Sequence, residues 1–589
     1  MMLFLLGACG APKAADNSGD NPDQSSEMSY CSEVKSYPSG VMVSGRGRYQ
    51  YRAVDRDSGL SASMTTDNIP YAEIRVTSSG GATVQCGTTD GNGQFSVVVP
   101  GAGTYTITIL ARSETAKVKV TVNADYYANK PHSISKTVTV SSSSYNAGDI
   151  TALGRASQAP NLEGGAFNIY AQIYKANEFL RTKLNNTGFV APRVKVYWRM
   201  GFNPYTYFGY STLLSFYRPG TGELFILGGD KGYVHNVDTD HFDDSVILHE
   251  YGHFLEDVYS VSDSPGGSHN GNSIIDPRLA WSEGWANFFQ SAVLRQSTPS
   301  WSYYVDTSGF LYDAVEGKGT SDVLASVNLA ASGSLYPDAV GADGEGTFRE
   351  MSVSRTLFKT VTTAGIEFSH VWRAFSTKSD NGQTSGFASP SVAFRNIGLF
   401  NQYLQYWINQ LQPGQQSDWD GVLSNEKQNK DARNYADTLV LNSGCTAYNK
   451  TIAPVVDDAH DLSNQFRSNH FYRFDHDGNG TTSILLEYTG GANTSGAKRN
   501  LNLHLYKEDY VYQESWESSN GTMVRSSAVA YPADGGDEQI SLSGLSAGRY
   551  LINVKAYTYD IGSGSLTGDM SYHLKQIKNG TTGYLCPSH

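Results

Sequence analysis

Short runs in which hydrophobic and polar positions alternate lie near both ends of the chain. Close to the N-terminus such runs cover residues 71–77, 94–100, 103–109 and 116–122. Turn-forming segments rich in Gly, Asp, Asn and Pro separate them. Alternation with a period of two, interrupted by such turns, is typical of β-strands in a hairpin-rich fold. The pattern predicts a β-sandwich over residues 38–140.

A second group of alternating runs lies near the C-terminus. Gly, Asn and Ser turns separate its members, which are residues 470–475, 483–488, 501–506, 538–542 and 548–554. This spacing again favours an all-β domain. We expect a second β-sandwich over residues 446–589.

The middle of the chain has a different periodicity. Apolar side chains recur there at every third or fourth position, as in helices, at residues 166–180, 346–358 and 369–375. Two segments, 193–199 and 222–229, have the pattern of strands. The expected fold class is therefore multidomain, with an α+β domain at residues 145–440 between two all-β sandwich domains.

One helix expected in this middle region carries two histidines four residues apart, His249 and His253, with Glu250 directly after the first. Residues four apart lie on one helical face, so the two imidazoles can hold one metal ion. Glu250 can then take a proton from a water at that metal. The alternative is a pair of histidines that only pack on a helix. Asp243 and Asp244 lie where helix N-caps are favoured.

A second predicted helix, around residues 280–289, carries one carboxylate, Glu283, on its apolar side. A buried carboxylate is costly unless it is paired or bound to metal. Two histidines, Glu283 and an open fourth position would form the ligand arrangement of a catalytic zinc. Asn287, one turn further on, is placed to accept a hydrogen bond from the free ring N–H of a ligand histidine.

These residues resemble the gluzincin group of zinc metallopeptidases, which have His-Glu-x-x-His on one helix and a Glu ligand on the next. The resemblance implies a zincin-like catalytic domain, one zinc ion per chain, and hydrolysis of peptide bonds with Glu250 as general base. In this chain 29 residues separate His253 from Glu283, against about twenty in thermolysin-like members. Thermolysin-like members also have Asp at the position of Asn287. The extra residues, 262–272, predict a loop that lines or covers the site.

The same resemblance implies an edge strand that pairs with an extended peptide substrate. We place this substrate strand at Leu224, Phe225, Ile226 and Leu227. The resemblance also implies a Tyr or His that stabilises the oxyanion, or a His that lines the cleft. The candidates are His269, Tyr303, Tyr304, Tyr336, His370 and Tyr403. Glu350 is expected to be solvated or salt-bridged rather than part of the site.

Both flanking domains carry phrases of known families. Thr89-Asp90-Gly-Asn92-Gly93-Gln-Phe95 resembles the recurring phrase of transthyretin-like, carboxypeptidase-regulatory domains. Residues 545–554 resemble the pre-peptidase C-terminal type of β-sandwich. In that second domain Asp475, Asp477, Asn479 and Gly480 have the spacing of a weak Ca²⁺ loop, but the distal Glu of such loops is missing. A tight turn is the favoured interpretation there.

Charge and composition restrict the partners. The chain has 589 residues, a formal net charge of −13 and no basic stripe, which argues against nucleic-acid binding. Its 60 glycines, 38 tyrosines and 17% charged residues favour a β-rich, secreted type of protein. We expect a monomer with a protein or peptide substrate.

The first nine residues are apolar and end in Leu6-Gly7-Ala8-Cys9, which resembles a bacterial lipobox. The resemblance implies a lipid on Cys9 and a lipoprotein of the bacterial outer membrane or cell surface. The alternative is an ordinary signal peptide with an incidental cysteine. Residues 10–37 follow as a flexible tether, because their polar composition favours disorder. No other segment has the length and apolarity of a membrane helix.

Four cysteines remain, and they allow three pairings. The domain layout favours Cys31–Cys86 and Cys445–Cys586, and disulfides would indicate an oxidising compartment. The alternative is four free buried thiols.

The sequence as a whole predicts a membrane-anchored, extracytoplasmic zinc endopeptidase. Two other functions remain open: a zinc hydrolase that acts on a non-peptide bond, and a binding or adhesion lipoprotein on a catalytically silent zincin scaffold. The presence of Glu250 argues against the silent scaffold, since a structural metal site needs no general base.

Overall fold

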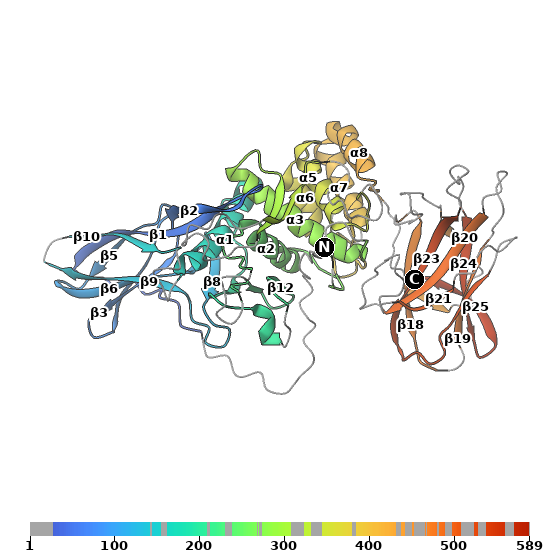
Figure 1. Ribbon diagram of the computed structural model, residues 1–589, viewed down its shortest axis with the longest axis horizontal. Coiled ribbons are helices and arrows are strands. Elements are labelled where there is room, and N and C mark those ends of the chain that lie inside the picture. Colours follow the sequence, from blue (N-terminus) through green and yellow to red (C-terminus); the bar gives the residue numbers. More distant parts are fainter. Residues whose placement is uncertain are drawn as a thin grey trace. The chain divides into compact units, whose positions relative to one another are not determined.

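The computed structural model is shown in Figure 1. It describes residues 27–141, 144–154, 162–208, 212–229, 238–267, 269, 274–307, 323–331, 344–379, 385–430, 438–441, 450–452, 466, 468–479, 482–488, 498–507, 523–527, 537–559 and 570–587. The expected lipobox with Cys9, the oxyanion candidate Tyr336, and Cys445 and Gly480 lie outside these residues. The chain forms two compact units, one of residues 1–258 and 286–329, the other of residues 259–285 and 330–589.

The first unit begins with two four-stranded sheets. In one sheet β1 pairs with three other strands; its members are β1 (Val41–Asp55), β2 (Gly59–Asn68), β5 (Gln94–Val99) and β10 (Tyr145–Ala152). The other has the order β4 (Thr83–Thr88), β3 (Glu73–Ser78), β6 (Gly103–Leu110) and β9 (Ser133–Val140). Alternate residues such as Val43, Ile74 and Ile107 are fully or almost fully buried. The structure thus has the sandwich-like β segment that the period-two pattern predicts.

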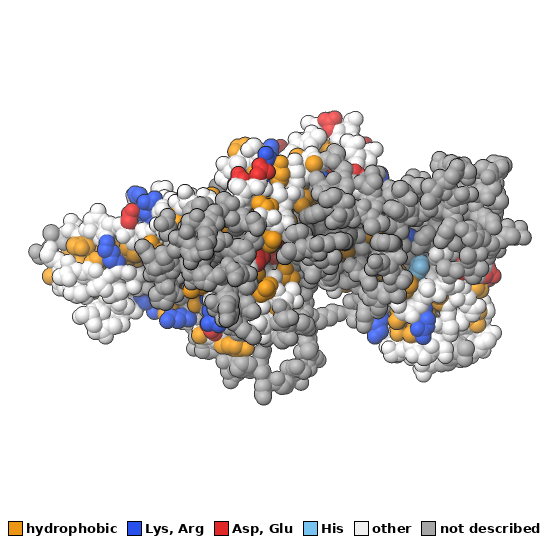
Figure 2. Space-filling model, viewed as in Figure 1, with side chains coloured by type: hydrophobic (Ala, Val, Ile, Leu, Met, Phe, Trp, Pro, Cys, Tyr) orange, Lys and Arg blue, Asp and Glu red, His pale blue; other side chains and the backbone are white. Residues whose placement is uncertain are grey.

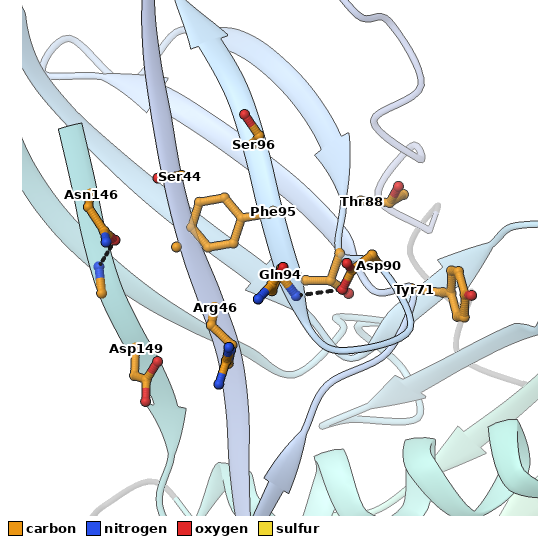
Figure 3. A pocket seen from close by; sticks show the side chains of 13 residues that line it. Ser44, Arg46, Tyr71, Thr88, Asp90, Gln94, Phe95, Ser96, Asn146 and Asp149 are labelled. Carbon is orange, nitrogen blue, oxygen red and sulfur yellow. Dashed lines mark hydrogen bonds between the residues drawn. The ribbon is translucent and has the colours of Figure 1, made fainter. Parts of the chain in front are cut away.

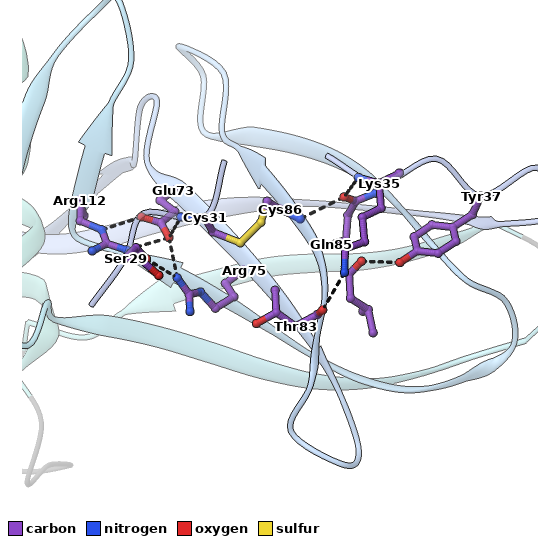
Figure 4. The surroundings of a disulfide bond; sticks show 11 residues. Ser29, Cys31, Lys35, Tyr37, Glu73, Arg75, Thr83, Gln85, Cys86 and Arg112 are labelled. Atoms are coloured by element: carbon purple, nitrogen blue, oxygen red, sulfur yellow. Dashed lines mark hydrogen bonds and ion pairs between the residues drawn. A yellow bond between two sulfur atoms is a disulfide. The ribbon is translucent and has the colours of Figure 1, made fainter. Parts of the chain in front are cut away.

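Residues 27–37 do not behave as the expected flexible tether. Cys31 is bonded to Cys86 of β4, as predicted, and its backbone N–H donates to Glu73 at 3.0 Å (Figure 4). The Lys35 backbone N–H donates to the Gln85 side chain at 2.8 Å. Composition favoured disorder for this segment, but the disulfide and these bonds attach it to the sheet.

A five-stranded mixed sheet follows in the same unit. Its order is β12 (Phe216–Arg218), β13 (Glu223–Phe225), β11 (Val194–Tyr197), β8 (Lys119–Asn123) and β7 (Arg112–Glu114). Helix α1 (Glu163–Lys183) packs against β8 and β1 (Figure 1). Hydrogen bonding therefore crosses the domain boundary expected near residue 140: β8 lies before it but joins β11, while β10 lies after it but joins β1. The period-two pattern of the sequence predicts a strand, but it does not predict which other strand it pairs with.

Two long helices follow. They are α2 (Asp244–Tyr259) and α3 (Pro277–Ser297), and the division between the two units passes through α3. Helix α3 is buried on nearly every side from Pro277 to Val293. The hairpin β14 (Tyr303–Thr307) and β15 (Val323–Asn328) completes the described part of the first unit, together with the short 3₁₀ helix η2 (Pro204–Phe208).

The second unit contains a helical region and a β region. The helices are α5 (Glu350–Thr362), α6 (Phe368–Ser376), α7 (Ile397–Leu411), the 3₁₀ turn η3 (Pro413–Gln415) and α8 (Gln416–Asn425). The predicted helices at 346–358 and 369–375 correspond to α5 and α6. Within this region Glu426 accepts hydrogen bonds from Arg355 and from Lys359 at 2.7 Å each, and all three side chains are buried.

The β region forms one sheet with the order β21-β20-β23-β18-β16-β25-β24-β19-β22, and β17 pairs with β24. Its strands are β16 (Thr438–Leu441), β17 (Lys450–Ile452), β18 (Asn469–His476), β19 (Thr482–Tyr488), β20 (Lys498–Lys507), β21 (Met523–Ser527), β22 (Glu538–Ser541), β23 (Gly548–Tyr559), β24 (Met570–Lys578) and β25 (Thr581–Pro587). Buried Ile484, Leu503 and Val554 belong to one apolar core. This is the second sandwich-like segment that the sequence predicts.

Among the described residues, no helix is both long and apolar enough to cross a bilayer. On the face drawn in Figure 2, the visible Lys and Arg side chains lie in small separate groups.

Candidate metal centre

Helix α2 brings the two predicted histidine ligands together. His249 and His253 are one turn apart and both are buried. Their Nε2 atoms lie 3.1 Å from each other. Two nitrogens bound to one tetrahedral zinc at about 2.0–2.1 Å would be roughly 3.3 Å apart. The spacing of the two imidazoles therefore fits a single zinc ion.

Asn287 of α3 is where the sequence predicts it. The Nδ1 of His249 lies 2.8 Å from Asn287 Oδ1. A side-chain oxygen accepts only from a protonated Nδ1, so this bond leaves Nε2 of His249 with its lone pair available to a metal. The close approach of the helices allows this contact: a Cβ on Gly252 of α2 would lie 3.0 Å from the Cα of Ala286 of α3.

Glu283 precedes Asn287 by one turn of α3 and is fully buried. One ligand atom from each of His249, His253 and Glu283 lies within 4.8 Å of the other two. The three predicted ligands thus form a candidate metal-binding group. Sequence spacing alone could not establish this, since the loop between α2 and α3 is long.

Glu250 also lies on α2 and is 2% exposed. Its carboxylate contributes, after burial and other charges, to the raised pKa of Asp240. It is therefore close enough to interact electrostatically with a group of acidic side chains next to the histidines.

That acidic group has no counterpart in the sequence-based expectations. Ligand atoms of Asp238, Asp240 and Asp306 lie within 4.8 Å of one another. Burial, followed by repulsion between the carboxylates, raises the pKa of Asp238 and Asp240 well above the ordinary value. Burial likewise raises the pKa of Asp306 to about 7, against the opposing effect of His249. The Asp238-x-Asp240 spacing was visible in the sequence, but Asp306 is distant along the chain.

His269 is buried in the loop between α2 and α3. Its Nδ1 lies 2.5 Å from Glu350 Oε2, and its Nε2 lies 3.8 Å from Glu283 Oε1. The sequence suggested His269 for the cleft and favoured a solvated or salt-bridged Glu350. Glu350 is buried rather than solvated, and its carboxylate contacts the histidine that lies beside Glu283.

The described tyrosine candidates differ in their surroundings. The ring of Tyr304 lies edge-on to His249, with centroids 5.7 Å apart. Arg56 donates a hydrogen bond to the Tyr303 hydroxyl. The Arg56 guanidinium lies 4.6 Å from the centre of the Tyr303 ring. Among the tyrosine candidates, Tyr304 thus has its ring beside a predicted ligand.

Two other candidates lie in the second unit. His370 is at the start of α6, where its Nδ1 contacts Ser369 at 3.2 Å, and burial lowers its pKa. Tyr403 packs edge-on against Phe387. These contacts do not include a predicted metal ligand.

The predicted substrate strand is wrong. Leu224 and Phe225 belong to β13, which has β11 on one side and β12 on the other, so β13 is not an edge. The Ile226 N–H donates to Tyr197 O at 3.0 Å, and the Leu227 N–H donates to Ser215 Oγ at 2.9 Å. Because their backbone donors are used within the fold, these residues cannot accept a peptide strand by β-augmentation.

The turn at residues 475–479 has the contacts of a structural turn. Arg549 donates to both carboxylate oxygens of Asp475 and lowers its pKa. Lys578 pairs with Asp477, which also accepts from the Asn479 N–H at 3.1 Å. Arg549 and Lys578 thus pair with the two carboxylates that would have to bind Ca²⁺ in this loop.

A separate cavity of about 890 Å³ lies against the first β-sandwich. Arg46, Asp90 and Asp149 are among its lining residues, and the Gln94 N–H donates to Asp90 at 2.8 Å (Figure 3). Its walls come from the β-sandwich, not from α2 or α3.

Comparisons with known proteins add little. No known family and no curated protein matches the chain. Among solved structures, the pre-peptidase C-terminal domain of a Bacillus anthracis collagenase is similar to 24% of this chain and 94% of its own, at 14% identity and a TM-score of 0.14. A Paenibacillus sp. cycloisomaltooligosaccharide glucanotransferase is similar over 90% of this chain and 72% of its own, at 10% identity and a TM-score of 0.11. Similarity at these scores carries no argument about activity.

Proposed function

We propose that the protein is a zinc-dependent endopeptidase with a zincin-like catalytic domain. The observation that carries the proposal is the convergence of His249, His253 and Glu283, with Asn287 holding His249 so that Nε2 can bind metal. Two histidines and one carboxylate are the ligand set of catalytic zinc, which keeps one position open.

A zinc ion held there would polarise the scissile carbonyl and acidify a water. The chain's own contribution is the placement of groups around that position. Glu250 follows the first ligand on α2 and accepts the proton of the attacking water, then returns it to the leaving amine. Tyr304, whose ring lies beside His249, is our candidate for donating to the developing oxyanion.

The second candidate function is a zinc hydrolase that acts on a non-peptide bond, since the same ligands and base serve any polarised carbonyl. A catalytically silent scaffold is disfavoured, because a purely structural metal site has no use for a general base at the position of Glu250.

We place the protein outside the cytoplasm, anchored by a lipid on Cys9. The Cys31–Cys86 disulfide supports an oxidising compartment. Radiolabelled palmitate incorporation into the full chain and into Cys9→Ser tests the anchor. Equal labelling of the two proteins would exclude it.

The test of activity compares the wild-type chain with Glu250→Gln in cleavage of casein and of quenched peptides. We expect the wild type to cleave, a chelator to abolish cleavage, and Glu250→Gln to lose at least a hundredfold in rate while it retains one zinc. Zinc without cleavage of any peptide would favour the non-peptide hydrolase. Full activity in Glu250→Gln would remove Glu250 from the mechanism.

A further inference from the structure

One histidine of the long loop between α2 and α3 lies beside the candidate metal centre. His269 lies fourteen residues before Glu283 along the chain, yet its Nε2 is 3.8 Å from Glu283 Oε1. Both side chains are almost completely buried. This loop therefore contains a group that contacts a predicted ligand.

A second element holds that histidine. Glu350 is the first residue of α5, and its carboxylate lies 2.5 Å from Nδ1 of His269. Helices α3 and α5 are in tight contact at this point, since a Cβ on Gly284 would lie 3.1 Å from the Glu350 carbonyl oxygen and 2.5 Å from Val353 Cβ. Glu350 is 1% exposed, so its carboxylate has little freedom to move away.

From these contacts we infer that His269 and Glu350 are positioning residues for the metal ligand Glu283. Glu350 fixes the orientation of the His269 ring, and the ring directs Nε2 towards the Glu283 carboxylate, which limits the rotation of that carboxylate. Ligands that are restrained by such outer contacts typically bind metal 10–100-fold more tightly than unrestrained ones. The inference rests on the proposed function, because it assigns a role towards the same zinc.

Direct ligation by His269 is a different possibility with a different geometry. The group whose ligand atoms all lie within 4.8 Å consists of His249, His253 and Glu283, and His269 is not a member. Its contacts on both ring nitrogens are with carboxylates. This arrangement suits a residue that acts through Glu283.

The test measures zinc affinity, by competition with a chromophoric chelator, in the full chain. We expect Glu350→Gln and His269→Ala each to raise the zinc dissociation constant about tenfold or more, and to change the visible d–d spectrum of the cobalt-substituted protein.

Glu426→Gln is the matched control. It neutralises another buried, ion-paired carboxylate of the same helical region, but Glu426 pairs with Arg355 and Lys359 and not with His269. We expect lower stability with zinc affinity and cobalt spectrum unchanged. An equal loss of affinity in this control would overturn the inference, because the effect would then be a general loss of structure.

Two further outcomes separate the inference from the proposed function. Zinc dissociation constants within threefold of wild type in both Glu350→Gln and His269→Ala would overturn the positioning role and leave the zinc site intact. A wild-type chain that binds no zinc would overturn the proposed function, and the positioning role with it.

Discussion

Replacing Gly284 by alanine tests the packing that places Glu283. Gly284 lies next to Glu283 on α3, and a Cβ there would be 2.5 Å from the Cβ of Val353 on α5. Carbon atoms in contact are ordinarily about 3.5–4.0 Å apart. The shortfall of about 1.0–1.5 Å has to come from movement of α3 or α5, and Glu283 moves with α3.

The expected magnitude has two parts of opposite sign. Alanine gains about 0.8–1.0 kcal/mol over glycine inside a helix. Forcing an extra carbon into a packed contact costs about 1–3 kcal/mol. With a clash of this size the upper end applies, so Gly284→Ala should be about 2 kcal/mol less stable than wild type. A displacement near 1 Å also exceeds the roughly 0.5 Å tolerance of a metal site, so zinc should bind more weakly.

Gly421→Ala supplies the control, because Gly421 is an exposed residue of α8 with nothing within 4 Å of its Cβ position. The same substitution should stabilise there, by up to about 1 kcal/mol. Urea unfolding and zinc competition on both variants are the assays. A Gly284→Ala protein that unfolds at or above the wild-type midpoint and binds zinc equally would refute the proposed packing of α3 on α5.

Three further predictions concern other contacts. Asn287→Ala removes the acceptor of His249 Nδ1 and should weaken zinc binding by about 10–100-fold in a competition titration; a change below threefold would argue against that role. Replacing Cys31 and Cys86 by serine opens a crosslink between residues 55 apart, and urea unfolding should show a loss of about 4 kcal/mol in the β-sandwich; no change in midpoint would mean that the bond does not stabilise it. Burial lowers the pKa of His241 from 6.5 to about 3, so below pH 6.5 the unfolded state binds a proton that the folded state does not, and stability falls as the pH falls towards 3. His241→Leu should reduce this dependence by about 1.4 kcal/mol per pH unit in unfolding experiments between pH 6 and 4; identical slopes in the two proteins would contradict the assignment.

The elements with strong periodicity could be predicted from the sequence. Helices α1, α5 and α6 and several strands, among them β5, β6, β18, β19, β20 and β23, correspond to predicted runs. Other strands of the two sandwich-like segments, among them β1, β2, β24 and β25, were not among the predicted runs. The pairing of His249 with His253 was predictable, because a four-residue spacing fixes one helical face. Glu283 was a candidate because a lone carboxylate on a buried helix needs a partner, but its approach to the histidines is known only from the structure.

Strand pairing and side-chain partners could not be predicted in the same way. An apolar run such as residues 222–229 is compatible with an edge or an interior strand, and β12, only three residues long, decides the question for β13. The contact of His269 with Glu350 joins residues 81 apart in the sequence. Asp306 is likewise far along the chain from Asp238 and Asp240, and no sequence pattern indicates that it lies beside them. Such contacts depend on the tertiary fold, which local patterns do not specify.

Anomalous X-ray scattering at the zinc edge, from crystals of the full chain grown with zinc, would locate the metal directly. We expect one zinc peak per chain, within about 2.0–2.2 Å of Nε2 of His249, Nε2 of His253 and a carboxylate oxygen of Glu283, with His269 outside bonding distance. A zinc peak bound by other residues, or none at these three side chains, would contradict the proposed metal centre.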